Sequence, residues 1–110
     1  MGIIVWKISD IDINSLPQII FSPFTIIQTQ EVTLTTQNIA YALPSNPLTD
    51  RLMLVIYNNS GSTIYWGGSN VTTSNGIPIL DTKHVVIGAS AGVYAVCGSA
   101  GKTLRIAEVK

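Results

Sequence analysis

Charge is what this sequence most lacks. Of its 110 residues, six are Lys or Arg and six are Asp or Glu, so charged residues make up 11% and the formal net charge is zero. A globular protein usually carries roughly 25% charged residues. No basic cluster can neutralise a run of phosphates or meet an anionic membrane, so we expect neither nucleic acid nor a membrane as partner. Hydrophobic residues make up 46%. The chain should therefore fold, and its leftover apolar surface predicts an obligate assembly rather than a free monomer.

Cysteine and histidine are almost absent, because Cys97 and His84 are the only residues of their kinds. A lone cysteine excludes an intrachain disulfide, and a zinc site needs about three or four such ligands. In "GVYAVCGSA" the cysteine alternates with Val93 and Ala95, which predicts a buried core thiol. His84 stands where a polar connection becomes a strand, as a partly exposed structural histidine would. A Ser-His-Asp triad would have to use it. We therefore expect no enzymatic activity, no metal and no cofactor.

Long apolar runs are also missing. The longest covers residues 52–57, far short of the roughly 20 residues that a membrane-spanning helix needs. The apolar start of the chain is interrupted by Asp10 and Asp12, so it is not expected to be a signal peptide. The stretch "CGSAGKT" ends like a phosphate-binding loop, but Val96 stands where that motif needs glycine, and "LRIAEV" follows instead of a helix. A hairpin turn is the prediction there.

Short strand-like segments separated by turn formers fill residues 31–110. "EVTLTT" has the period-two alternation of a half-buried strand, and "LMLVIY" is apolar throughout, which predicts a central or interface strand. "IYWGG", "IPIL", "HVVIGA", "GVYAVCGS" and "KTLRIAEV" supply further strands, and Asn75-Gly76 is a tight-turn signal. This spacing predicts an all-β fold, a compact antiparallel β-sandwich that is jelly-roll-like or a small barrel.

Residues 1–30 differ from the rest. They are rich in isoleucine, and Pro17 and Pro23 forbid one continuous helix. The segment should be extended. Two interpretations stay open: it adds edge strands to its own domain, or it is an arm that lies on a neighbouring subunit and adds a strand to an exposed edge.

Three aromatic residues, Tyr57, Tyr65 and Trp66, lie beside asparagines and glycines that could hydrogen-bond a sugar. Apolar faces with a few fixed polar groups suit a small-ligand site. The other interpretation is that Trp66 fills the core while the tyrosines lie at sheet edges or at a subunit seam.

The combination of segments from residue 31 onward resembles a small β domain that recurs in virion proteins of tailed bacteriophages. The resemblance rests on "LVIYNNSGSTIYWGGSNVTTSNGIPIL", on "GVYAVCGSAGKTLRIAEV" and on the order of the two. Leu80 is followed directly by "DTKHVVIG", without the glycine turn often found there. The resemblance implies a non-enzymatic structural part on the phage particle, made in the host cytoplasm: a head decoration or cement protein, a head-fibre base or a tail-associated subunit, often a homotrimer.

The expected partners are therefore sister subunits and the major capsid protein or other virion subunits. A carbohydrate- or receptor-binding module of a phage tail or fibre, centred on Tyr65 and Trp66, is the alternative function. The N-terminal segment supplies the candidate oligomer or capsid contacts, which are its apolar residues Ile3, Ile4, Val5, Trp6, Ile8, Ile19, Ile20, Phe21 and Phe24.

Overall fold

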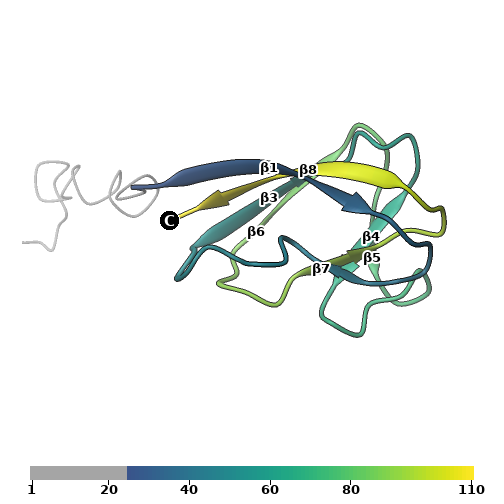
Figure 1. Cartoon of the computed structure of the whole chain (residues 1–110), viewed down its shortest axis with the longest axis horizontal. Coiled ribbons are helices and arrows are strands. Elements are labelled where there is room, and N and C mark those ends of the chain that lie inside the picture. Colours follow the sequence, from purple (N-terminus) through teal and green to yellow (C-terminus); the bar gives the residue numbers. More distant parts are fainter. Residues whose placement is uncertain (1–24) are drawn as a thin grey trace, which may run out of the picture.

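The computed structural model describes residues 25–110, which form eight β-strands and no helix (Figure 1). The strands are β1 (Ile27–Leu34), β2 (Tyr41–Ala42), β3 (Met53–Tyr57), β4 (Ile64–Gly67), β5 (Ile77–Ile79), β6 (His84–Ile87), β7 (Tyr94–Val96) and β8 (Lys102–Val109). They make two four-stranded sheets, β1-β8-β3-β6 and β2-β7-β4-β5, in which every pairing is antiparallel. The predicted all-β antiparallel sandwich is confirmed.

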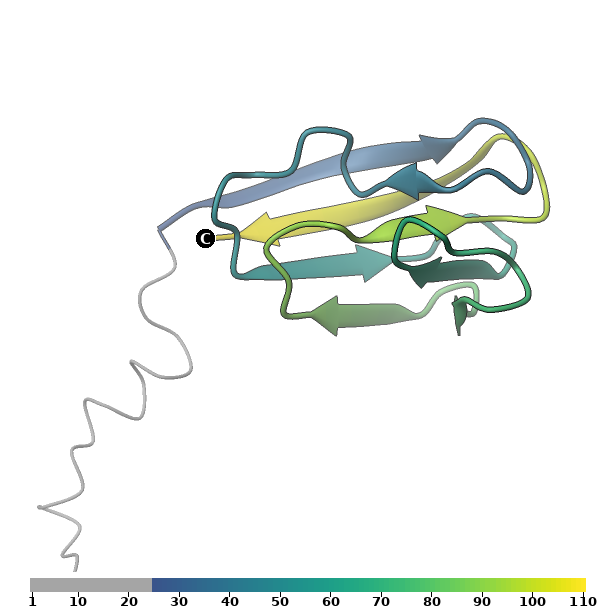
Figure 2. The same ribbon diagram turned by 90° about the horizontal axis from the view of Figure 1, so that it is seen from below.

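The order of the strands identifies the architecture more closely. β4 pairs with β5, and around this hairpin β3 pairs with β6, β2 with β7 and β1 with β8. Residues 25–110 thus form a folded-back ribbon of strand pairs. Successive pairs belong alternately to the first and the second sheet, which is the topology of the double-sheet jelly roll. Figure 2 shows β1 and β6 at opposite edges of the first sheet. The termini of this ribbon meet, since the N–H of Thr25 donates to the carbonyl of Lys110.

The core lies between the two sheets because alternate residues of each strand point inward. In the central strand β3, Leu54 and Ile56 are fully buried while Met53 and Val55 are half-buried. Cys97 packs in the same core, so its predicted burial is confirmed. The core cluster consists of Leu34, Leu43, Leu54, Ile56, Ile64, Ile79, Val93, Ala95, Cys97, Leu104 and Ile106.

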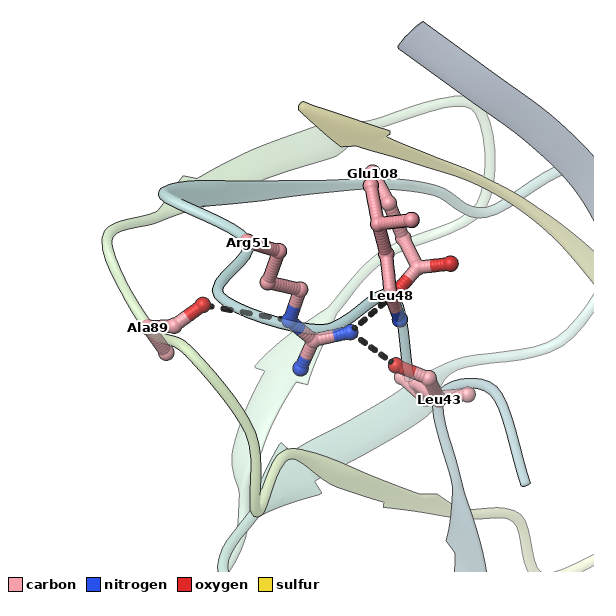
Figure 3. A network of polar contacts seen from close by, with 5 residues as sticks. All are labelled: Leu43, Leu48, Arg51, Ala89 and Glu108. Carbon is pink, nitrogen blue, oxygen red and sulfur yellow. Dashed lines mark hydrogen bonds and ion pairs between the residues drawn. The ribbon is translucent and has the colours of Figure 1, made fainter. Parts of the chain in front are cut away.

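A buried ion pair fastens the connection between β2 and β3 to the first sheet (Figure 3). Nη1 of Arg51 lies 3.0 Å from Oε2 of Glu108 on β8, and both side chains are almost fully buried. Arg51 also donates from Nη1 to the Leu43 carbonyl (2.7 Å) and from Nε to the Ala89 carbonyl (3.1 Å). The Leu48 N–H donates to the same carboxylate oxygen at 2.7 Å. One charged pair therefore holds together three segments that are distant in sequence.

The structure locates three local features of the sequence. β1 begins at Ile27, so residues 27–30 lie in an edge strand of the first sheet. The turn after Cys97 is not a hairpin, because β7 and β8 lie in different sheets and the turn crosses between them. Asn75-Gly76 lies at the end of a turn in the polar connection of residues 68–76 between β4 and β5, where the N–H of Gly76 donates to the Thr72 carbonyl.

Candidate functional site

The outer face of the first sheet is the surface that turns away from the core. Its members follow from the strand alternation and from the register of β1, β8, β3 and β6, in which Thr29, Ala107, Val55 and Val86 form one row across the sheet. The outer face consists of Ile27, Thr29, Glu31, Thr33, Met53, Val55, Tyr57, His84, Val86, Thr103, Arg105, Ala107 and Val109.

Much of the outer face is apolar and open to solvent. Ile27 is 69% exposed, Val86 is 53% exposed and Tyr57 is 37% exposed. Val55 between them is half-buried. Val109 is buried and yet does not belong to the core cluster, in agreement with its place on this face. Contiguous exposed apolar side chains on a small domain usually mark a contact surface.

One row of the outer face carries its polar chemistry. Glu31 on β1 stands opposite Arg105 on β8, which stands opposite Tyr57 on β3, which stands opposite His84 on β6. Glu31 and Arg105 form no ion pair within 4.0 Å; the ion pair found within residues 25–110 is that of Arg51 with Glu108. The carboxylate and the guanidinium are thus adjacent, and neither has an ion-pair partner among residues 25–110, so both can meet groups on another molecule.

The middle of this face is hollowed. The hollow has a volume of about 530 Å³ and draws its lining from three neighbouring strands. That volume falls within the ~300–1,000 Å³ of small-molecule sites, although such sites usually enclose their ligand. The lining residues are Thr29, Gln30, Glu31, Val55, Tyr57, Arg105, Ile106 and Ala107.

The titratable residues that the sequence offers for chemistry are kept apart. His84 is exposed at the start of β6, whereas the Cys97 thiol is buried and lies 3.5 Å from the carbonyl oxygen of Thr63. Within the part of the chain that the structure describes, no group of three or more His, Cys, Asp or Glu side chains could hold a metal ion. Residues 25–110 also contain no helix that is long and apolar enough to cross a membrane.

The three aromatic residues of the predicted ligand surface lie on two sheets. Tyr57 is on β3, at the hollow of the outer face. Tyr65 and Trp66 are neighbours on β4 of the second sheet, so their side chains point to opposite sides of it. Trp66 packs against the core cluster, and its Nε1 is buried without a hydrogen-bond partner in the part of the chain that the structure describes. The structure does not bring the three side chains onto one surface.

The candidate contacts in the N-terminal segment, Ile3 to Phe24, lie outside the described residues. The outer face was not predicted as a site, although a signal for it exists. Alternation in "HVVI" and "LRIAEV" assigns Val86 and Arg105 to the side opposite the core residues Leu104 and Ile106.

Comparisons with protein families, with curated proteins and with solved structures find no match to this chain.

Proposed function

We propose that this protein is a non-enzymatic structural subunit of a bacteriophage virion: a capsid decoration or cement protein, or a head-fibre base, that binds the capsid surface as an oligomer and stabilises it. The resemblance of residues 31–110 to small phage virion domains supports the virion assignment. Viral capsid proteins are among the proteins that use the jelly roll, but so are lectins, and a fold alone does not decide a function.

The observation that carries the proposal is the chemistry of the outer face. Covering its exposed apolar side chains with another surface lowers the free energy by roughly 25 cal/mol per Å² of apolar area buried. Its single acid, Glu31, and single arginine, Arg105, can fix the orientation of a partner without a large desolvation cost. A surface of this kind suits permanent association better than turnover of a substrate.

A pair of exposed residues, one on each sheet, allows a sharp experiment. Val86 on β6 is 53% exposed and Ile77 on β5 is 54% exposed. Undecorated phage heads are mixed with full-length Val86→Glu or with the matched control Ile77→Glu, and the bound protein is measured by co-sedimentation. Val86→Glu should weaken binding by roughly tenfold or more, because burial of an unpaired carboxylate costs more than the ~1.4 kcal/mol of a tenfold change.

Equal binding of the two variants would show that the outer face does not contact the capsid. Failure of the intact protein to bind any phage particle would overturn the virion assignment itself. The number of copies is a further prediction: the resemblance implies a homotrimer, which the mass of the purified protein in solution tests.

A second candidate function is a carbohydrate- or receptor-binding module, and the position of Tyr57 favours it. Its ring lies at the hollow together with Glu31, Arg105 and Thr29, a combination of one aromatic surface and several polar groups. Tyr57→Ala should then abolish retention on immobilised glycans without changing the unfolding midpoint. Trp66→Ala is the less useful variant, because Trp66 packs against the core and its truncation should destabilise the domain.

A further inference from the structure

The four edges of the two sheets are unequal. A strand at a sheet edge presents unpaired backbone groups, and proteins usually protect such edges by shortness, proline, lysine or a covering segment. β2 has two residues, β5 has three including Pro78, and β6 has four. β1 has eight residues, and its sequence IQTQEVTL contains neither proline nor lysine. It is the long edge of the sandwich, and Glu31 is the only charged residue on it.

The hydrogen-bond pattern identifies which groups of β1 face outward. Ile26 and Lys110 exchange both backbone hydrogen bonds, N–H to carbonyl in each direction at 2.9 Å. In an antiparallel ladder such reciprocal pairs recur at every second residue, so the even-numbered residues of β1 bond to β8. The N–H and C=O groups of Ile27, Thr29, Glu31 and Thr33 therefore point away from β8. Within residues 25–110, no backbone hydrogen bond reaches them.

We propose that β1 pairs with β1 of a second copy of this chain, antiparallel and around a two-fold axis at Gln30. Residues directly opposite each other in an antiparallel pair point to the same side of the sheet. For the outer faces of both copies to lie on one side, the two-fold axis must therefore pass through a residue that pairs with its own copy. An axis at Glu31 would bring two carboxylates together, which is unfavourable. An axis at Gln30 places each Glu31 opposite Thr29 and uses the outward groups of residues 27–33 on both strands.

The pairing would join the two first sheets into one continuous sheet, with β6 at both of its ends. The hollow would then continue across the axis, because Thr29, Gln30 and Glu31 form its β1 side. This inference does not rest on the proposed function and holds for any assembly in which the copies occur in even numbers. With the predicted trimer, it implies that two trimers meet.

Two exposed glutamines of β1 provide the test. Gln28 and Gln30 are the same residue type, on the same strand and on the same side of the sheet. In the proposed register the two Gln30 residues are a non-hydrogen-bonded pair, with Cα atoms about 4.5 Å apart, which is within the range of a disulfide. The two Gln28 residues are four positions out of register, so their separation along the strand is on the order of 13 Å.

Full-length Gln30→Cys, under mild oxidation, should form a covalent dimer on a non-reducing gel, and Gln28→Cys should remain monomeric. The native thiol is buried and common to both variants. No dimer with Gln30→Cys, or equal dimer with both variants, would overturn the pairing.

A second variant measures the pairing without an added thiol. Thr29→Pro removes one outward N–H group and leaves the hydrogen bonds to β8 intact, and proline is tolerated on an edge strand. The solution mass should fall to half that of the unmodified protein, while Thr29→Ser should leave the mass unchanged. Circular dichroism of Thr29→Pro checks that the fold is retained. A solution mass of the unmodified protein that corresponds to one or three chains would also overturn the pairing.

Discussion

The two sheets of the sandwich differ in the length of their strands and in what their faces cover. The first sheet contains both eight-residue strands, β1 and β8, whereas no strand of the second sheet exceeds four residues. The second sheet is joined by connections rich in Asn, Ser and Gly, and its inner side covers the core. The first sheet covers the core with one face and keeps an apolar face open on the other. Length and exposure together indicate that the second sheet closes the fold and that the first is available for association.

The inner side of the edge strand β1 is only partly covered. On the inner side of β1, Val32 is half-buried and Leu34 fully buried, whereas Gln28 and Gln30 on the same side are exposed. The sequence of β1 thus changes from apolar to amide side chains where its inner side becomes exposed, while Ile106 and Glu108, their partners on β8, stay buried. The half of β1 that carries Gln28 and Gln30 can therefore contact water and still keep an extended backbone.

The largest loss of stability is expected at the buried ion pair, which fastens the first sheet to the connection between β2 and β3. Glu108→Gln should lower the free energy of unfolding by about 3–5 kcal/mol, because the Arg51 charge stays buried without its counter-charge. Urea unfolding at constant pH gives this value from the midpoint and slope.

Glu31→Gln is the matched control, since it removes an exposed acid from the same sheet. It should change the stability by less than about 0.5 kcal/mol. Equal losses for the two variants would show that the buried pair does not stabilise the connection between β2 and β3.

The second sheet should be sensitive to added volume in its longest turn. A Cβ atom on Gly76 would lie 2.7 Å from Cβ of Tyr65, 2.7 Å from Cγ2 of Val71 and 2.9 Å from the Thr72 carbonyl oxygen. Gly76→Ala should therefore cost about 1–3 kcal/mol, because backbone and Cβ atoms cannot rotate away. On Gly68, in the same connection, a Cβ atom would meet only Asn70 Oδ1 at 3.6 Å. Thermal unfolding that ranks Gly68→Ala as the worse variant would contradict this packing.

The smallest change in stability is expected on the outer face of the first sheet. Val85 and Val86 are neighbours on β6, but Val85 packs against the core and Val86 points outward. Val85→Ser should destabilise by about 1–3 kcal/mol, since it buries an unpaired hydroxyl group. Val86→Ser should stay within about 0.5 kcal/mol and instead weaken association. A Val86→Ser variant that unfolds as early as Val85→Ser would show that the outer face is part of the core.

Strand positions were predictable from the sequence because their cause is local. Alternation in "EVTL" and the apolar run "LMLVIY" reflect how each strand meets the core, and the structure has β1 and β3 there. Which strands pair is not local. The turn after Cys97 has the composition of a hairpin, yet it crosses between sheets, because the partners of β8 are β1 and β3.

The buried ion pair shows the same limit. Arg51 and Glu108 are distant in sequence, and charged residues are mostly exposed, so neither composition nor spacing joins them. A partial signal was present in "TLRIAEV". Leu104, Ile106 and Glu108 alternate, which places the carboxylate on the buried side of β8, where it needs a cation. The partner could be identified only once the connection between β2 and β3 was located.

The nested strand pairs have a consequence for the order of folding. β4 and β5 are close in sequence and can zip locally, whereas β1 and β8 bring together the two ends of the described chain. A contact between segments so far apart in sequence forms only after a long loop has been closed, which costs chain entropy. Folds dominated by such contacts therefore form slowly. We expect the ribbon to coil up from its middle, so that β1 docks last. During synthesis β1 emerges from the ribosome long before β8, so its backbone N–H and C=O groups stay without their intrachain partner until the last strand of the domain has been made.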